Sequence, residues 1–353
     1  MANIRKLHPG IYIKNAIEAM EMTSKEFSIR TGISERTLSP IINEKGNITF
    51  DVAFKLSNFF GSSINYWTNL QTQYDLYLKE EENRIGIEKD WELLKTIKKY
   101  LVDYNYINKN DEKSKIVETI RKLVGVNYLY NLNEKDLLVC FKEQNNKKEN
   151  DLFKKNFWIA LALTEARKKL NLKYNKEKLK YYIGEIRALT TSDPKHFYPR
   201  LQEIFADCGI SFVVLPYLSK SNIYGVTKWF NKDNVMIAIS NRGESADLFW
   251  FTIFHEISHV LMEHRREVLL NIKDYEDNEA DKMATDFLIP AEKWNIFINN
   301  QNFTKESIEQ FAAKIGILPR IVLGRLHKEI PNMVPYGKYD KDFNTSYHIF
   351  YEN

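Results

Sequence analysis

The feature that most limits how this chain can fold is a five-residue motif, HEISH, at positions 255–259. Apolar residues surround the motif at helical spacing, which predicts a buried amphipathic helix that begins near Ser245. In such a helix, His255 and His259 lie one turn apart on the same face. Both imidazoles can therefore reach one metal ion at roughly 2.0–2.1 Å, and Zn²⁺ is the ion that this ligand pair favours.

The residue after the first histidine is an acid, Glu256. It is rotated by about 100° around the helix from His255, so its carboxylate stays outside the coordination shell. From there it can accept a proton from a water molecule that the metal activates. The motif therefore predicts a hydrolytic zinc site in which Glu256 is the catalytic base.

A catalytic zinc ion takes three protein ligands and keeps one position open, so a third donor must come from elsewhere. We expect Glu279, at the edge of a second amphipathic helix, to supply it, with Glu276 as the alternative if that helix begins earlier. A carboxylate that faces a core needs a partner, and the ion would provide one. Asp281 is either a hydrogen-bond partner of a ligating histidine or a solvated acid. The core stripe of this helix consists of Ala280, Met283, Ala284, Phe287 and Leu288.

An HExxH motif can also occur by chance, with two histidines that only pack or face solvent. The context argues against this, because three of the seven histidines lie within ten residues in an apolar helix. The third of them, His264, either orients the site or interacts with the negative end of the helix dipole.

The sequence of residues 1–78 alternates short apolar stretches at helical spacing with Gly-containing turns, which predicts a bundle of about five short helices. Thr23 and Ser34 are placed to cap two consecutive helices with a turn at Gly32, which is the spacing of a helix-turn-helix unit. The first turns of the second helix would approach base edges in the major groove of DNA, and its end would approach phosphates. The predicted contacts are Glu35, Arg36, Thr37 and Ser39 with bases, and Asn43 and Lys45 with phosphates.

Two observations weaken the DNA-binding prediction. Pro40 falls inside the proposed recognition helix, where it removes one hydrogen bond and costs about 3 kcal/mol in a regular helix. Residues 1–78 also carry eight Lys and Arg against seven Asp and Glu, which is not a strongly basic surface. The alternative is a helical bundle that pairs two copies of the chain.

The remaining sequence predicts an α+β chain. Residues 79–175 are rich in Lys, Asn and Tyr and are expected to form a helical connector. Three β-branched and aromatic runs follow, at 210–218, 224–230 and 235–240, and the last two predict an antiparallel hairpin. We therefore expect a small antiparallel sheet inside a domain at 176–331, followed by a tail at 332–353.

Length and composition agree with a folded, multidomain chain. A length of 353 residues exceeds the roughly 100–200 residues of an ordinary domain, and 44% of the residues are hydrophobic. The two cysteines, Cys140 and Cys208, lack the spacing of a thiolate zinc site or a disulfide framework. No signal peptide or membrane span is evident in the sequence, so we expect a cytoplasmic protein without a membrane partner.

The two halves resemble two known families. Residues 8–76 resemble the HigA-like branch of the Xre helix-turn-helix family through HPG, SERTLSPIINEKGNIT and YWTNLQTQYDL. Residues 200–325 resemble the ImmA/IrrE metallopeptidases through GVTKW, FWFTIFHEISHVLMEH and EADKMATDFLIP. The chain departs from the first family at Pro40, where a basic or polar residue is usual, and at Glu44, where glycine is usual.

The resemblance implies a gluzincin-like fold that binds zinc through His255, His259 and Glu279. It also implies a regulator that cleaves a repressor or a toxin partner in a stress, mobile-element or toxin-antitoxin system. The alternative is a HigA-like operator-binding regulator in which the zinc fold is a sensor or docking platform with little proteolysis. Operator DNA, a protein substrate and a second copy of the chain are the expected partners.

Overall fold

The chain divides into two compact units, residues 1–89 and 90–353, and α5 (Ile64–Lys95) contains the boundary between them. The structure is a computed structural model, and it describes residues 7–133, 149–169, 172–241, 244–263 and 275–347, without the side chains of 149–150 and 275–278. The predicted divisions at 78, 175 and 331 remain predictions. No helix among these described residues is long and apolar enough to cross a membrane.

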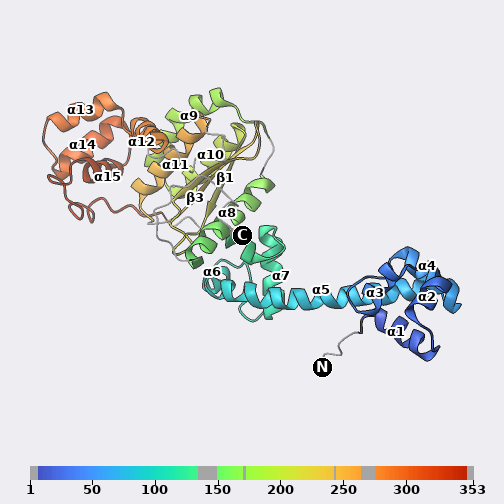
Figure 1. Cartoon of the computed structure of the whole chain (residues 1–353). Coiled ribbons are helices and arrows are strands. Elements are labelled where there is room, and N and C mark those ends of the chain that lie inside the picture. The colour runs from blue at the N-terminus through green and yellow to red at the C-terminus, as the bar shows by residue number, and fades with distance from the viewer. Residues whose placement is uncertain (1–6, 134–148, 170–171, 242–243, 264–274, 348–353) are drawn as a thin grey trace. The chain divides into compact units, whose positions relative to one another are not determined.

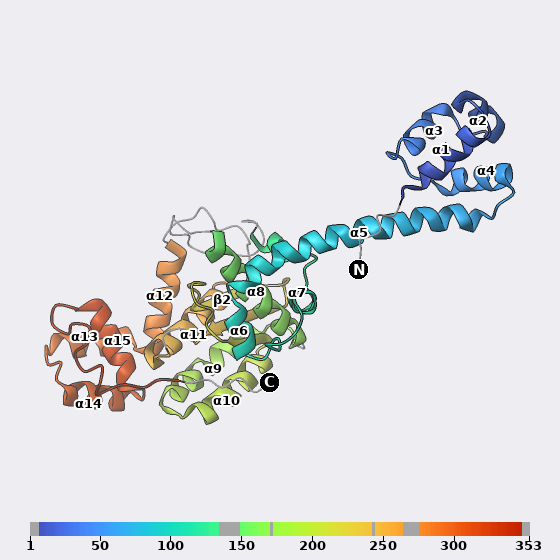
Figure 2. The ribbon, with the colours of Figure 1, turned by 90° about the horizontal axis from the view of Figure 1, so that it is seen from below.

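The first unit is a helical bundle in which four short helices pack against the beginning of α5 (Figure 2). The four helices are α1 (Pro9–Ala19), α2 (Ser24–Thr31), α3 (Glu35–Ile42) and α4 (Phe50–Phe60). Each contributes apolar residues at helical spacing to one core, in which Phe27, Leu38 and Leu56 are fully or almost fully buried. The predicted bundle is confirmed.

The predicted caps of the helix-turn-helix unit are also present. The Thr23 hydroxyl accepts the Glu26 amide at 3.1 Å, and the Ser34 hydroxyl accepts the Thr37 amide at 3.2 Å. Gly32 ends α2 with φ 69°, a left-handed conformation that glycine adopts without steric cost. These contacts confirm the predicted turn between α2 and α3.

Pro40 lies in the last turn of α3, which ends two residues later at Ile42. The Pro40 carbonyl accepts the amides of Lys45 and Gly46 at 2.8 and 3.0 Å. These bonds satisfy a carbonyl that the helix end would otherwise leave without a partner. The helix therefore ends soon after Pro40, and Asn43 and Lys45 lie just beyond it.

The second unit contains a sheet with helices on both faces (Figure 1). Before the sheet come α6 (Lys98–Asp103), α7 (Lys113–Val124), the short 3₁₀ helix η1 (Leu129–Asn133), α8 (Glu149–Lys168), α9 (Lys176–Ala188), η2 (Leu189–Thr191) and α10 (Pro194–Asp207). After it come α11 (Ala246–Leu261), α12 (Tyr275–Leu288), α13 (Ala291–Asn299), α14 (Lys305–Ile315) and α15 (Pro319–Glu329).

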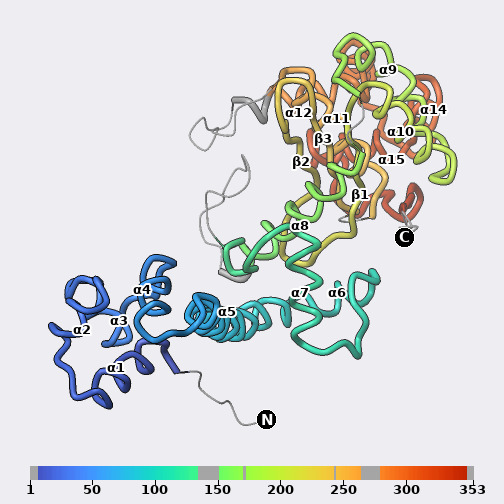
Figure 3. The backbone as a smooth tube through the Cα atoms, turned by 90° about the vertical axis from the view of Figure 1, so that its right-hand side faces the viewer, coloured from blue at the N-terminus to red at the C-terminus, as the bar shows by residue number. Residues whose placement is uncertain are grey.

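Within the part of the chain that the structure describes, the sheet has three strands, which the tube in Figure 3 follows in chain order: β1 (Ile210–Leu215), β2 (Gly225–Trp229) and β3 (Val235–Ser240). Their spatial order is β1-β3-β2. The antiparallel hairpin of β2 and β3 is confirmed, but β1 pairs with β3 in parallel, so the sheet is mixed and the prediction of an antiparallel sheet is wrong in this respect. β2 runs antiparallel to β3 along one edge of that strand, and β1 runs parallel to β3 along its other edge.

β1 and β3 are buried on both faces of the sheet, and β2 is partly buried. Alternate residues of the central strand, Val235, Ile237 and Ile239, join the core that α10 and α11 complete. The intervening residues Met236 and Ala238 are fully buried on the other face, and α8 contacts both β1 and β3. The three-layer arrangement fixes α11 against β2 and β3, and α12 packs beside it.

The end of α5 is anchored in the second unit by a buried ion pair. Asp90 is completely buried, and its carboxylate accepts Arg121 Nε of α7 at 2.7 Å and the Tyr130 amide of η1 at 3.0 Å. The Arg121 guanidinium also lies over the Tyr128 ring, 4.8 Å from its centroid. Asp90 therefore ties α5 to α7 and η1.

Replacement of Asp90 by alanine is expected to lower the free energy of unfolding of the second unit by about 3 kcal/mol, because it leaves the Arg121 charge buried without its counter-ion. Five of the six tryptophans lie in residues 90–353, so tryptophan fluorescence during urea unfolding reports on this unit. As a control, Asp111→Ala removes a surface ion pair with Lys115 and should cost less than about 1 kcal/mol. If the two variants lose equal amounts of unfolding free energy, the assigned role of Asp90 is contradicted.

Candidate metal centre

The histidine motif lies on α11, a helix of the second unit in which most residues are buried. Ser245 precedes the helix in an extended conformation, and Asp247 in the first turn stabilises its positive end. Ile253, Phe254 and Ile257 are completely buried and fix the rotation of the helix about its axis. This packing leaves His255 and His259 partly exposed on the same side, as the spacing predicts.

The two histidine rings converge on one point. Their Nε2 atoms lie 3.0 Å apart, and the rings meet edge to face with centroids separated by 4.6 Å. Two nitrogens bound at roughly 2.0–2.1 Å to one tetrahedral ion lie about 3.3 Å apart. The pair is therefore close to the geometry that a shared ion requires.

Asp281 of α12 contacts the His255 ring at Nδ1, the ring nitrogen that does not face His259. Its Oδ1 lies 2.9 Å from His255 Nδ1, and its Oδ2 lies 3.4 Å from Lys328 Nζ. Burial opposes ionisation of Asp281, but the hydrogen bond with His255 and the charge of Lys328 outweigh it and lower the pKa of the carboxyl group. An ionised Asp281 accepts a hydrogen bond from His255 Nδ1–H, which keeps the proton on Nδ1 and leaves the Nε2 lone pair available for a metal.

Glu256 points toward the sheet and is 6% exposed. The Thr227 hydroxyl of β2 donates to Glu256 Oε2 at 2.7 Å, which fixes the direction of the carboxylate. Gly225, also on β2, leaves room for it, because a Cβ atom there would lie 2.7 Å from Glu256 Oε1. Neither Thr227 nor Gly225 was predicted as a site residue, although both belong to the GVTKW segment that resembles the metallopeptidase family.

The third predicted ligand does not join the histidines. The side chain of Glu279 is exposed, and among the described residues no group of three or more His, Cys, Asp or Glu side chains could hold a metal ion. Glu279 and Asp281 are separated by about 200° around α12, so they leave the helix on opposite flanks of its buried stripe, Ala280, Ala284 and Leu288. His264 lies outside the described residues, as does the side chain of Glu276.

The flank of α12 that faces His255 is the one that carries Asp281. Four residues before Asp281, which is about one helical turn, the sequence has Asp277, whose side chain lies outside the described residues. Register along α12 therefore identifies a second acidic position for the third ligand. The spacing pattern that selected Glu279 could not distinguish the two positions, because it did not include the rotation of α12 against α11.

The predicted DNA contacts lie together on the surface of the first unit. The side chains of Glu35, Arg36, Thr37, Ser39, Asn43 and Lys45 are all exposed, whereas Leu38 and Ile41 of the same helix are buried. One face of α3 is therefore committed to the core, and the opposite face is open to a partner. The contacts themselves remain predictions.

Cys208 is not part of either site. It lies at the end of α10, is completely buried, and its burial raises the pKa of the thiol to about 12. The thiolate is the reactive form, so Cys208 is inert at neutral pH. Cys140 lies outside the described residues.

Family models match both units of the chain. A helix-turn-helix model matches residues 13–67. The model of the IrrE N-terminal-like domain, of peptidase family M78, matches residues 209–327, a range that contains β1 and the HEISH motif. The two matched ranges agree with the two resemblances in the sequence.

Several curated relatives are similar to about a quarter of the chain. An uncharacterized HTH-type transcriptional regulator of Escherichia coli (strain K12), YbaQ, is 27% identical over 94 residues, which are 26% of this chain and 81% of that protein. A second one from the same strain, YddM, is 30% identical over 81 residues, 23% of this chain and 84% of that protein. Virulence-associated protein A′ of Dichelobacter nodosus is 36% identical over 70 residues, 20% of this chain and 61% of that protein.

Among solved structures, an addiction module antidote protein of a HigA family from Coxiella burnetii is 28% identical. The match covers 25% of this chain and 96% of that chain, with a TM-score of 0.23.

Proposed function

The chain belongs to the Xre-type helix-turn-helix regulators through its first unit and to the IrrE-like M78 peptidases through residues 209–327, and we propose that it is a zinc-dependent endopeptidase with a DNA-binding domain. Its substrate would be a regulatory protein, such as a repressor in a stress, mobile-element or toxin-antitoxin system. The observation that carries the proposal is the convergence of His255 and His259 next to a Glu256 carboxylate that Thr227 orients.

The residues of α11 divide the chemistry between them. His255 and His259 would hold the ion, which when bound would polarise the scissile carbonyl and activate a water molecule. Glu256 would accept the proton of that water and pass it to the leaving amine. The hydrogen bond from Thr227 keeps the carboxylate in one orientation, so that it is placed before the substrate arrives.

The third ligand would come from the first turns of α12. Glu279 is the residue that sequence spacing predicts, and Asp277 is the acid four residues before Asp281 in the sequence. We favour Asp277, because it is one helical turn from Asp281, which contacts His255, whereas the side chain of Glu279 is exposed. The carboxylate of Asp281 would then act through His255, by holding its ring.

The substrate would lie in an extended conformation across the site. β2 is one of the two edge strands of the sheet, and it contacts α11. Its outer edge can accept a peptide strand through backbone hydrogen bonds, whereas β3 is paired on both sides. Of the two hairpin strands, β2 is therefore the one that would bind substrate.

The first unit would bring the peptidase to DNA. The exposed face of α3 would place Glu35, Arg36, Thr37 and Ser39 near bases, with Asn43 and Lys45 near phosphates. A second candidate function, an operator-binding regulator with little proteolysis, is favoured by the names of the relatives. Salt-dependent operator binding that survives His255→Ala, together with an absence of cleavage, would select this second function.

The proposed function is tested with a variant that can bind its substrate but cannot cleave it. The Glu256→Gln chain, expressed in its native host, should retain a bound protein that the wild-type chain does not retain. Addition of the zinc-loaded wild-type chain to the purified partner should then cut it at defined peptide bonds, which mass spectrometry of the new termini identifies. A captured partner that stays intact under these conditions would argue for the regulator.

A further inference from the structure

A pocket opens beside the candidate metal centre in the second unit. Its volume is about 370 Å³, and three helices and the segment after α15 form its walls. The apolar lining consists of Leu248 and Phe251 of α11, Leu288 and Ile289 at the end of α12, Ile321 of α15, and Tyr336. A pocket of this size is at the lower end of the range for ligand sites in proteins.

The pocket continues the face of α11 that carries the histidines. Phe251 and Leu248 precede His255 by four and seven residues, so all three lie along one side of the helix. The Phe251 ring lies 6.2 Å from the His255 ring, measured between centroids. The Lys328 ammonium lies 5.0 Å from the centroid of Phe251 and also contacts Asp281, which holds His255. The pocket therefore borders the residues that would hold the ion.

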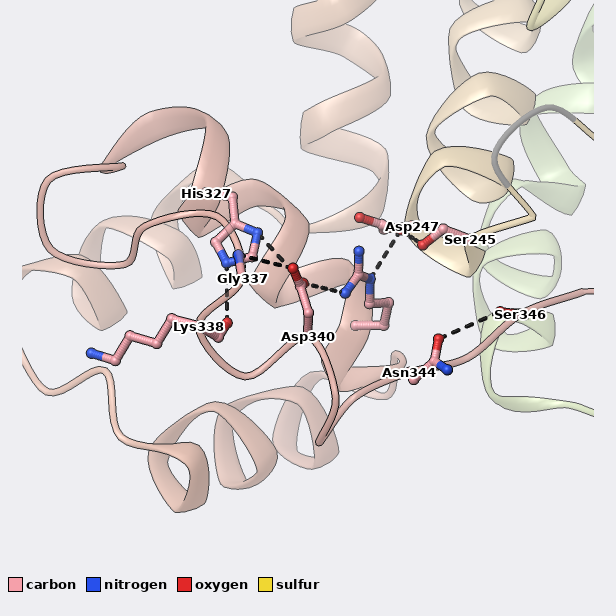
Figure 4. A network of polar contacts seen from close by, with 9 residues as sticks. Ser245, Asp247, His327, Gly337, Lys338, Asp340, Asn344 and Ser346 are labelled. Carbon is pink, nitrogen blue, oxygen red and sulfur yellow. Dashed lines mark hydrogen bonds and ion pairs between the residues drawn. The ribbon is translucent and has the colours of Figure 1, made fainter.

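A polar network fixes the wall of the pocket on the side of α15 (Figure 4). Arg320 connects α11 to the segment after α15, because its guanidinium contacts both Asp247 and Asp340. Gly324 lets the two helices approach closely, since a Cβ atom there would lie 2.5 Å from Asp247 Oδ2. The buried His327 ring contacts the Lys338 carbonyl at 3.3 Å and lies 5.0 Å from the Tyr336 ring. These contacts hold α15 and the segment after it against α11.

The charged groups around the pocket are paired with one another. Arg320 contacts Asp247, and Arg325 contacts Glu329 at 2.8 Å and stacks over Trp294 at 4.3 Å. Because these charged side chains are paired with one another, the pocket favours an apolar ligand over a charged one. Its position next to the histidines indicates a side chain of the substrate rather than a separate small molecule.

We infer that this pocket is a specificity subsite that binds a large apolar side chain of the substrate, of the leucine, methionine or phenylalanine class, next to the scissile bond. The inference rests on the proposed function and specifies which peptides it would act on. A leucine or phenylalanine side chain that enters the pocket removes its apolar surface from water against Leu248, Phe251 and Ile321. A glycine or alanine at the same position would leave the pocket unfilled.

The test compares cleavage profiles of the full chain. Zinc-loaded wild-type chain is incubated with a peptide mixture from a digested cell lysate, and mass spectrometry identifies the bonds that are cut. Large apolar residues should be enriched about tenfold over glycine and alanine at one position beside the cut. Leu248→Trp, which fills the pocket from a residue that is 39% exposed, should shift the preference to small residues. Ile296→Trp, an exposed position on α13 outside the lining, should leave the profile unchanged.

A second variant covers the case in which Leu248→Trp fails to fold. Tyr336→Ala alters a side chain that is 74% exposed and widens the pocket, so it should shift the preference toward tryptophan and phenylalanine. A wild-type profile without an apolar preference, or one that neither variant changes, would overturn the inference while leaving the peptidase intact.

Failure of the proposed function gives a different result, which is no cleavage by any of the chains. The subsite is then tested by ligand-detected NMR with N-acetyl-L-phenylalanine amide and with N-acetylglycine amide. The phenylalanine probe should bind the wild-type and Ile296→Trp chains and bind Leu248→Trp about tenfold more weakly. Equal signals from the two probes, or equal binding to the three chains, would overturn the subsite independently of catalysis.

Discussion

Glu256→Gln should lower the rate of peptide-bond cleavage by a factor of about 10⁴ and leave the zinc content unchanged. Glutamine keeps the size of the side chain and can still contact the Thr227 hydroxyl, but it cannot accept a proton at neutral pH. Positioned general bases contribute typically 10²–10⁴-fold, and Thr227 of β2 holds the Glu256 carboxylate in one orientation. The measurement is kcat on a peptide that the wild-type chain cuts, with zinc determined by mass spectrometry on the same samples.

The matched control is Glu263→Gln. Glu263 follows α11 closely in the sequence, but it forms an ion pair with Lys176 at 3.6 Å and lies beyond the motif. This variant should retain the wild-type rate within about twofold, since surface pairs of this kind contribute little. Cleavage at the wild-type rate by the Glu256→Gln chain would remove Glu256 from the mechanism.

Asp277→Asn should remove most of the bound zinc, and Glu279→Gln should leave the zinc content near that of the wild-type chain. The difference follows from α12, which places Asp281 against His255 and leaves Glu279 exposed on the other flank. A zinc ion that loses one of three protein ligands retains only the histidine pair. Zinc per chain, measured after dialysis against a chelator of moderate strength, compares the two variants directly.

Asp286→Asn, on the same helix beyond Asp281, is the control for a general effect of charge removal from α12. The reverse pattern, in which Glu279→Gln loses zinc and Asp277→Asn retains it, would restore the ligand that the sequence spacing predicts. In that case α12 would have to turn when the ion binds.

The sequence predicts those features that depend on one segment of chain. The caps at Thr23 and Ser34, the strand at 235–240 and the one-turn spacing of His255 and His259 are set by neighbouring residues, and the structure confirms them. Periodicity and turn chemistry are local properties, so a single sequence contains the information that they need.

Features that depend on how segments meet are not predictable in the same way. The parallel pairing of β1 with β3 arises because β2 occupies the outer edge of the sheet, which no local pattern encodes. The flank of α12 that faces His255 depends on the rotation of one helix against another. The contact between Thr227 and Glu256 joins residues 29 positions apart, and the pocket brings Leu248 near Tyr336.

The most direct measurement of the central claim is the position of zinc in crystals of the zinc-loaded chain, located by anomalous scattering at the zinc edge. A single peak about 2.0–2.1 Å from the Nε2 atoms of both His255 and His259, with Glu256 outside the coordination shell, is the predicted result. Zinc bound elsewhere in the chain, with no peak between these two nitrogens, would contradict it.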